Sequence, residues 1–410
     1  MAYDLASTSW GEEEVNAIQR VIREGRLTMG DNVRRFEEAF AAKFGVKHAV
    51  MVNSGSSANL VGVAALCHTR GRPLQRGDEV IVPAISWATT FHPLQQYGLK
   101  LRFVDVDLHT LNMDVSQLEA ALTPRTRMLM AVSILGNPAA LDVMRAFCDT
   151  HDLHFFEDNC EWLGASLNGR ACGTFGDLGT FSTFYSHHIS TMEGGVLVTD
   201  DTEIAHLAKA IRNHGWARDL PADSPLASPP AGQDDGGFFE AYRFIMPGYN
   251  VRPLEICGAI GVEQLKKLDR MLELRRANAA HFVRLFEGDA RFILQRENGR
   301  SSWFSFTIIL NPDLGIDRAG VMEAMRKADI GFRMITGGCF LRHEAVRFFD
   351  YSVAGDIVNA NIAHDHGFFV GNHPRDLTPE ITRLREVLDV AARPGGRAGA
   401  AGRAQRSIPS

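Results

Sequence analysis

Short apolar runs alternate with amphipathic stretches through the first part of the chain. Runs rich in β-branched and aromatic residues predict strands at residues 48–52, 79–82, 101–105, 127–132 and 153–156. Apolar residues at helical spacing between these runs predict a helix that opens in the 53–59 turn and runs to about residue 66, and helices at about residues 90–97, 115–121 and 141–151. This alternation predicts a largely parallel sheet with helices on both faces, and ligands at the carboxyl ends of its strands.

The stretch from Gly176 to Asp201 predicts two further strands, at residues 180–185 and 196–199, joined by a polar turn. The turn carries Ser182, Ser186, His187, His188 and Glu193 and closes with Gly194-Gly195, where the backbone is free to take positive φ. An exposed hairpin with incidental histidines is the plainer interpretation of these residues alone. A metal site is not favoured, because adjacent histidines point apart and no further His or Cys lies at zinc-ligand spacing.

The pattern is different at the two ends of the chain. Near the N-terminus Ser9 is a candidate helix cap, and apolar residues at positions 33, 36, 40 and 44 predict a second amphipathic helix. From about Val251 a long charged helix to Phe286, a strand at 303–310 and helices at 318–328 and 379–392 predict a smaller α/β domain. We therefore expect a large domain over 1–250 and a small domain over 251–392. Residues 220–237 read as a surface loop, and 393–410 read as a disordered tail.

Composition narrows the class of protein. The chain has 410 residues, 45% of them apolar, and a formal net charge of −6, which argues against a nucleic-acid or membrane-surface partner. The six cysteines form no CxxC or CxC pair, so neither a disulfide framework nor a cysteine-rich metal site is indicated. No apolar run approaches the length of a membrane span, and a reduced cytoplasm is the expected location.

Three groups of residues at predicted strand ends are candidates for ligand contacts. The turn at residues 53–59 opens a helix with Gly55, Ser56 and Ser57, and free N–H groups at a helix start suit a phosphate, although an ordinary helix cap has the same pattern. Trp87 has an indole that could stack on a flat ring or pack in the core. Asp158 ends a buried strand, where its carboxylate needs a partner such as a pyridinium nitrogen, or serves as a helix cap.

A resemblance changes the balance between these alternatives. The Gly176-Asp177 turn, the strand with Ser182, a residue five places on and the Glu193-Gly194-Gly195 turn resemble the lysine segment of the vitamin B6-dependent sugar aminotransferases of the DegT/StrS type. The resemblance runs from about Trp10 to about Ala392. It implies the fold-type-I architecture of the pyridoxal phosphate-dependent transferases (aspartate aminotransferase-like), with a large mixed, mostly parallel sheet domain and a smaller C-terminal α/β domain.

The resemblance also implies roles for individual residues. In the family the positions that match Gly55, Ser56, Ser57 and Ser182 bind the cofactor phosphate. The position of Trp87 stacks on the cofactor ring, that of Asp158 pairs with the ring nitrogen, and that of Glu161 lies near the ring hydroxyl. The position of Asn250, with Arg252 assisting, reaches the cofactor phosphate of the neighbouring subunit. Thr28 and Gly30 are weaker candidates for the wall of the site. Arg333 or Arg342 is a candidate contact to a substrate diphosphate, although a solvated arginine is the plainer interpretation of either residue.

One departure from the family pattern decides the expected chemistry. The family's imine-forming lysine is replaced by His187, and no lysine occurs between Lys100 and Lys209. A histidine there is similar to a small branch of the family, the sugar-nucleotide 3-dehydratases that make 3,6-dideoxysugars such as colitose and ascarylose. The resemblance therefore implies a homodimer with shared sites that uses pyridoxal or pyridoxamine 5′-phosphate to remove the carbon-3 hydroxyl of a nucleotide-linked 4-keto-6-deoxyhexose, with L-glutamate restoring the amine form.

Some alternatives stay open at the level of sequence. The ascarylose-type relatives add a cysteine set for an iron–sulfur cluster, whereas Cys257 stands alone here, so no cluster is expected. A sugar aminotransferase with an unusual proton carrier and a non-catalytic relative are the competing functions.

The identity of the histidine at the lysine position depends on where the count starts. Counting five residues from Ser182 reaches His187, and counting five from Thr183 reaches His188. We expect His187 to be the proton carrier, because that register leaves Phe181 on the opposite side of the strand.

Overall fold

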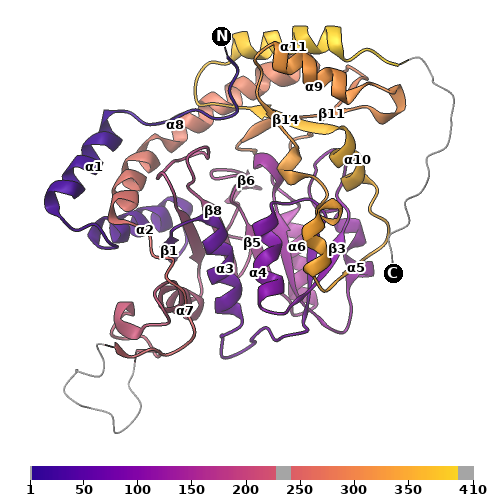
Figure 1. Ribbon diagram of the computed structural model, residues 1–410. Coiled ribbons are helices and arrows are strands. Elements are labelled where there is room, and N and C mark those ends of the chain that lie inside the picture. The colour runs from indigo at the N-terminus through magenta and orange to yellow at the C-terminus, as the bar shows by residue number, and fades with distance from the viewer. Residues whose placement is uncertain (1, 228–241, 396–410) are drawn as a thin grey trace.

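The computed structural model describes residues 2–227 and 242–395, which form two sheets and the helices that cover them (Figure 1). The larger sheet has the strand order β1-β9-β8-β5-β4-β2-β3-β13, and β9 alone of these eight runs antiparallel to the rest. Its strands are β1 (His48–Val52), β2 (Glu79–Pro83), β3 (Lys100–Val104), β4 (Thr126–Val132), β5 (His154–Asp158), β8 (Leu178–Ser182), β9 (Gly195–Thr199) and β13 (Tyr351–Val353). The expectation of a largely parallel sheet is confirmed.

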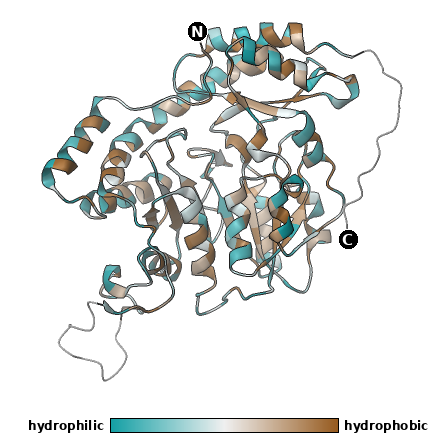
Figure 2. Cartoon of the chain, viewed as in Figure 1, coloured by the Kyte–Doolittle hydropathy of each residue, from teal (hydrophilic) through white to brown (hydrophobic). Residues whose placement is uncertain are grey.

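Helices cover both faces of this sheet, because its strands are apolar on both sides (Figure 2). Val80 and Val82 pack with one layer of helices, whereas Ile81 between them packs with the other. The helices described are α1 (Glu12–Glu24), α2 (Asp31–Phe44), α3 (Gly55–Leu66), α4 (Ala88–Gln96), α5 (Leu118–Ala121), α6 (Leu141–Thr150), α7 (Thr202–Arg212), α8 (Glu255–Phe286), α9 (Arg318–Lys327), α10 (Asn359–His366) and α11 (Thr378–Ala391). One layer contains α3, α4 and α7, and the other contains α2, α6 and part of α8.

Several boundaries differ from the sequence-based expectation, and four of the differences have a clear local description. The strand predicted at 180–185 ends at Ser182, because its hydroxyl accepts a hydrogen bond from the Phe184 amide and turns the chain. The strand predicted from residue 303 begins at Ser305, since Trp303 takes a left-handed conformation with φ of 48°. The helix predicted at 115–121 begins as a 3₁₀ turn. The cap of α1 is Gly11 rather than Ser9, and the Glu14 carboxylate accepts from the Gly11 amide.

A smaller antiparallel sheet lies beside the large one and packs against α8, α9 and α11. Its order is β10-β11-β14-β12, and a separate pair is formed by β6 and β7. These strands are β6 (Ser166–Leu167), β7 (Arg170–Ala171), β10 (Phe292–Leu294), β11 (Ser305–Leu310), β12 (Phe332–Arg333) and β14 (Gly367–Gly371). The long helix expected to end at Phe286 is confirmed as α8.

The division into domains at residues 250 and 251 stays a prediction, and two segments cross it. Tyr3 is buried in the core of the small sheet and donates its hydroxyl to the Gly371 carbonyl at 2.6 Å. In the other direction, β13 from the C-terminal half adds a parallel edge strand beside β3 of the large sheet. Most of the loop expected at 220–237 and of the tail expected at 393–410 lies outside the described residues. No helix in the described ranges is long and apolar enough to cross a membrane.

A buried carboxylate ties the loop before β8 to the sheet. Glu157 on β5 is fully enclosed, and its two oxygens accept hydrogen bonds from the amides of Gly173 at 2.8 Å and Gly176 at 2.6 Å. Burial raises the pKa of Glu157 to about 7, although the backbone N–H donors act in the opposite direction. The side chain therefore fixes the segment that leads into β8 and Ser182.

Glu157→Gln tests this tie. The amide of glutamine has one acceptor oxygen, so one of the two backbone N–H groups should lose its partner and the free energy of unfolding should fall by about 1–3 kcal/mol. Denaturant titration of the purified protein measures this loss. Glu386→Gln, at an exposed position on α11, is the control and should change stability by less than about 0.5 kcal/mol. Equal stability of the two variants would contradict the structural role of Glu157.

Candidate active site

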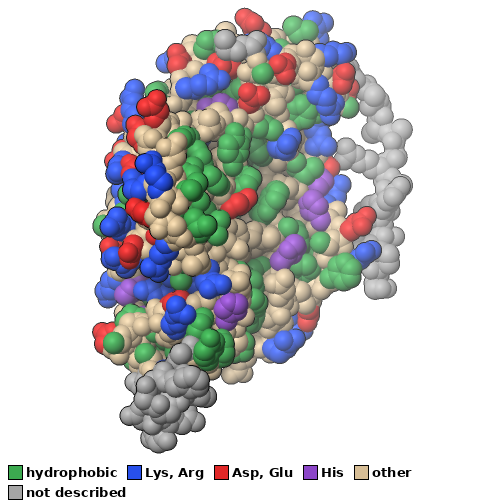
Figure 3. All heavy atoms as spheres, turned by 60° about the vertical axis from the view of Figure 1, so that its left-hand side comes forward, with side chains coloured by type: hydrophobic (Ala, Val, Ile, Leu, Met, Phe, Trp, Pro, Cys, Tyr) green, Lys and Arg blue, Asp and Glu red, His purple; other side chains and the backbone are tan. Residues whose placement is uncertain are grey.

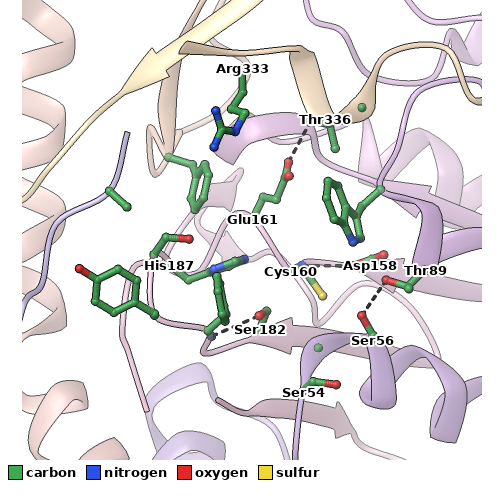
Figure 4. A pocket seen from close by; sticks show the side chains of 18 of the residues that line it. Ser54, Ser56, Thr89, Asp158, Cys160, Glu161, Ser182, His187, Arg333 and Thr336 are labelled. Atoms are coloured by element: carbon green, nitrogen blue, oxygen red, sulfur yellow. Dashed lines mark hydrogen bonds between the residues drawn. The ribbon is translucent and has the colours of Figure 1, made fainter. Parts of the chain in front are cut away.

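A cavity of about 650 Å³ lies where the parallel strands of the large sheet end (Figure 4). Residues at or just after the ends of β1, β2, β5 and β8 line its lower wall, and residues just before β11, in and after β12 and in β14 line the upper wall. Ten of the residues named from the sequence line it: Gly55, Ser56, Trp87, Asp158, Glu161, Ser182, Ser186, His187, Glu193 and Arg333. Leu5 and Ala6, from the N-terminal segment, also line the cavity.

The first turn of α3 has the geometry of an anion site. Ser54 caps the helix by accepting from the Ser57 amide at 3.1 Å, and the amides of Gly55 and Ser56 have no acceptor among the described residues. A Cβ at Gly55 would lie 2.6 Å from the Ser182 Cβ and 2.8 Å from the Cys160 sulfur, so only glycine lets the helix start this close to β8. The free amides and the Ser182 hydroxyl therefore meet at one corner of the cavity.

Asp158 supplies a buried negative charge to the floor of the cavity. The side chain is 4% exposed, and its Oδ2 accepts from Asn59 Nδ2 at 2.8 Å and from Thr90 Oγ1 at 2.7 Å. Its Oδ1 accepts only the Cys160 amide at 3.2 Å, and no cationic side chain in the described part of the chain pairs with it. A buried carboxylate without a counter-charge fits a cationic group of a ligand.

Glu161 is a second carboxyl group in the cavity wall. Burial raises its pKa to about 7, and the negative Asp158 raises it further, although hydrogen bonds from the Leu135 amide and the Thr336 hydroxyl oppose the change. Both of these donors contact Oε2. The other oxygen, Oε1, has no partner in the described ranges and is open to the cavity. This carboxyl can therefore hold or release a proton near neutral pH.

The two adjacent histidines lie in different environments. His187 lines the cavity, its buried Nδ1 has no hydrogen-bond partner among the residues described, and its Nε2 is open to the cavity. Burial and then the charge of Arg275 lower the pKa of His187 to about 4. His188 is 1% exposed, lies outside the cavity wall and donates from Nε2 to the Ser302 carbonyl at 3.2 Å. Only His187 is therefore placed to contact a ligand in the cavity.

Other residues singled out from the sequence lie away from the cavity wall. They are Thr28, Gly30, Ser57, His188, Asn250, Arg252 and Arg342. Asn250 is exposed and accepts from Arg252 Nε at 2.9 Å, so the two side chains contact each other on the surface. Arg342 pairs with Asp365 at 3.4 Å, whereas Arg333 has no carboxylate partner within the described residues and faces the cavity.

Several lining residues were not found from the sequence. They include Leu5, Ala6, Asn59, Thr89, Cys160, Tyr185, Phe304, Thr336 and Phe369. Asn59 had a readable signal, since it is a polar residue in the middle of an otherwise apolar helix. Phe304, Thr336 and Phe369 come from the small sheet and its connections, and no local pattern relates them to β5 or β8. No group of His, Cys, Asp or Glu suited to hold a metal occurs in the described part of the chain.

Comparison with known proteins identifies the family. The GDP-4-keto-6-deoxy-D-mannose 3-dehydratase of Yersinia pseudotuberculosis is 48% identical over 388 residues, 94% of this chain and 98% of that protein. The crystal structure of the E. coli enzyme of this name with bound hydrated pyridoxal phosphate is 47% identical and superposes with a TM-score of 0.92 over 95% of this chain and 100% of that one. A structure of such a dehydratase with a trapped pyridoxal phosphate–glutamate geminal diamine has a TM-score of 0.91 at 47% identity, over 94% of this chain and 100% of that one. These likenesses confirm the expected fold class.

The family model for the DegT/DnrJ/EryC1/StrS aminotransferases matches residues 8–387, nearly the full length of the described sequence. Together with the relatives above, this match confirms the resemblance that the Gly176–Asp201 stretch indicated. The chain belongs to the DegT/DnrJ/EryC1/StrS aminotransferase family.

Proposed function

We propose that this protein is a pyridoxal phosphate-dependent 3-dehydratase, which removes the carbon-3 hydroxyl of a GDP-linked 4-keto-6-deoxyhexose. The observation that carries the proposal is a cavity with free helix amides at Gly55, a buried carboxylate at Asp158 and an imidazole at His187, in which no described residue supplies a lysine to the wall or a cation to Asp158. The 48% identity to a dehydratase named for a GDP-sugar supports the choice of nucleotide.

The cavity residues fit the cofactor group by group. The α3 amides and Ser182 would hold the phosphate, because they converge where a Cβ at Gly55 would leave no room. Asp158 would pair with the ring nitrogen and keep it protonated, since no cationic side chain in the described ranges pairs with this carboxylate. Trp87 would cover the ring, and Glu161 would lie at its hydroxyl. The amine form of the cofactor, held by these residues, would supply an amino group for the carbon-4 ketone and an electron sink for loss of the carbon-3 hydroxyl.

His187 would move the proton that this chemistry requires. Its low pKa keeps the imidazole neutral near pH 7, so Nε2 is free to accept a proton from the cofactor methylene group. The same low pKa makes the protonated imidazole a strong acid, which would pass the proton to the departing hydroxyl. An imidazole cannot hold the cofactor covalently as a lysine amine does, so the cofactor remains available to the substrate.

Arg333 is the better of the two candidate contacts to the nucleotide diphosphate. Its guanidinium faces the cavity without a carboxylate partner among the residues described, whereas the guanidinium of Arg342 already contacts Asp365.

L-glutamate is the proposed amino donor that restores the amine form of the cofactor, in line with the glutamate adduct in a related dehydratase. Six free cysteines support a reduced, cytoplasmic setting for the chain.

The direct test of the proposed function is an assay with 4-keto-6-deoxyhexoses linked to GDP, CDP, UDP or dTDP. The GDP-linked substrate should yield a 3-deoxy sugar and ammonia in a reaction that consumes glutamate and needs no reductase. Metal analysis of the same preparation should find no stoichiometric iron or sulfide. A stable 4-amino sugar as the sole product would identify an aminotransferase instead, and absence of turnover with all four nucleotides would favour a non-catalytic protein.

Substitution of the two histidines tests the proposed proton carrier. His187→Asn should lower turnover by about 100- to 10,000-fold while the cofactor remains bound, because general acid–base catalysis contributes a factor of that size. His188→Asn is the matched control and should affect stability more than turnover, since its imidazole contacts only the Ser302 carbonyl. Turnover lost in the His188 variant and kept in the His187 variant would assign the role to the other histidine.

A third variant, His187→Lys, tests the geometry of the same position without measuring turnover. A lysine at the family position should hold the cofactor covalently, so borohydride reduction should fix it to the variant and not to the wild-type chain. Failure of the variant to trap bound cofactor would show that residue 187 does not face it.

The expected assembly is a homodimer in which each chain completes the neighbouring site. Trp87 is 61% exposed although it lines the cavity, and apolar side chains gather on the face formed by the left-hand part of Figure 1 (Figure 3). Large exposed apolar residues include Leu27, Phe184, Tyr185, Met192, Phe244 and Leu254. Asn250 lies outside its own cavity, which suits a residue that acts on the partner's cofactor phosphate.

Mixing of inactive variants tests the shared site. His187→Asn and Asn250→Asp should each be nearly inactive as dimers, whereas subunit exchange should restore about a quarter of wild-type activity, since half of the dimers then carry one intact site. Sedimentation velocity should show a dimer before and after exchange. A fully active monomer, or no recovery on mixing despite exchange, would contradict shared sites.

A further inference from the structure

Arg275, in the middle of α8, is a buried cation without an anionic partner. The side chain belongs to a residue that is 3% exposed, and no carboxylate in the described part of the chain pairs with it. Its Nη1 donates to the Phe304 carbonyl at 3.1 Å and to the Asn372 carbonyl, and its Nε has no partner among residues 2–227 and 242–395. Burying an arginine with only carbonyl acceptors is costly, so a compensating role is expected at this position.

The carbonyls that Arg275 holds belong to the wall behind His187. Phe304 lines the cavity, and its ring centroid is 5.3 Å from that of His187 and 5.6 Å from that of His188. Trp303 beside it has a φ of 48°, a conformation that a bulky residue adopts only when its surroundings hold it there. Asn372 donates to the Trp303 carbonyl at 2.7 Å, so the arginine and the asparagine together hold this strained segment in place.

The charge of Arg275 also acts on the imidazole itself. Burial is the first cause of the low pKa of His187, and Arg275 is the charged group that adds to it. Other ionisable side chains around the cavity come from different elements: Asp158 at the end of β5, Cys160 and Glu161 after it, Tyr185 and Glu193 in the β8–β9 loop, and Arg333 on β12. His188 adjoins His187 in the chain and is itself kept neutral by burial and by Arg275.

We infer that Arg275 is a positioning residue for the proton carrier: its Nη1 donates to the carbonyls of Phe304 and Asn372 and holds the Trp303–Phe304 backbone, so that the Phe304 ring lies against His187 with a buried guanidinium behind it. The inference rests on the proposed role of His187 in dehydration. On this inference, the proton affinity of His187 depends on α8 and on the residues just before β11, which lie away from the strand ends proposed to bind the cofactor.

The test is the titration of His187 in the cofactor-loaded protein, followed by NMR of ¹⁵N-labelled histidine downward from neutral pH. The His187 signal is assigned by its loss in His187→Asn. Arg275→Met should raise the midpoint of His187 by about 1 pH unit, because a nearby like charge is removed. Arg275→Lys should keep the midpoint low while the Phe304 contact loosens, since the lysine side chain is shorter and its ammonium cannot approach both carbonyls as closely as Nη1 does.

Arg276→Met is the matched control. Arg276 is the next residue of α8 and donates to the carbonyls of Ser301 at 2.9 Å and Gly164 at 3.0 Å, so the substitution removes a similar pair of backbone contacts. Its charge is not among the causes of the low pKa of His187. The His187 midpoint should therefore stay unchanged in this variant. If Arg275→Met does not fold, Arg275→Gln keeps one amide donor and removes the same charge.

The activity profile separates this inference from the proposed function. In Arg275→Met the acid limb of kcat/KM against pH should move upward by the same amount as the NMR midpoint, and in Arg276→Met it should not move. An unchanged His187 midpoint in a folded Arg275→Met or Arg275→Gln variant would overturn the inference whatever the activity. A shifted midpoint together with full activity of His187→Asn would support the inference and refute the proposed role of His187 in catalysis.

Discussion

The close approach of α3 to the end of β8 is the contact on which the site depends. Gly55 begins the helix with no side chain between it and Ser182. The free amides of the helix therefore lie next to the start of the loop that carries His187. A methyl group there would push the helix and the strand apart by more than the neighbouring side chains can yield. The same approach encloses Cys160 and brings the end of β5, with Asp158, alongside. One glycine thus sets the spacing of the anion corner, the buried carboxylate and the proton carrier.

The part of this arrangement that follows from strand and helix order could be predicted from the sequence. Gly55 comes just after a strand with a clear apolar pattern, Asp158 and Ser182 are the last residues of two more, and parallel strands bring their carboxyl ends to one edge of a sheet. The sheet, its covering helices and α8 were predicted for the same reason. The end of β8 was placed three residues too late, because the Ser182 hydroxyl competes with the ladder for the Phe184 amide, and strand propensity carries no information on such a bond.

What could not be predicted comes from contacts between segments far apart in the chain. Thr336 and Phe304 approach Glu161 and His187 only because the small sheet lies over the cavity, and Tyr3 brings the N-terminal segment into the core of that sheet. Trp303 lies in a run that reads as strand, yet contacts with Asn372 and Gly136 hold it in a left-handed conformation. Such tertiary contacts override local propensity and leave no periodic signal. Arg275 is another residue whose surroundings the sequence does not indicate. In the sequence it is one charged residue on a charged helix, and only the structure shows that it is buried.

Burial and a nearby cation act alike on any base at position 187. Both disfavour the protonated form, whether the group is an imidazole or an amine, because each raises the free energy of a positive charge there. A lysine at this position would therefore be held as a free amine, the form that attacks a carbonyl, whereas the histidine is held as a free proton acceptor. Replacement of lysine by histidine in these surroundings would change the chemistry from covalent capture of the cofactor to proton transfer, without any rearrangement of the charges around it. The surroundings of residue 187 thus specify neutrality, and the identity of the side chain specifies what the neutral group does.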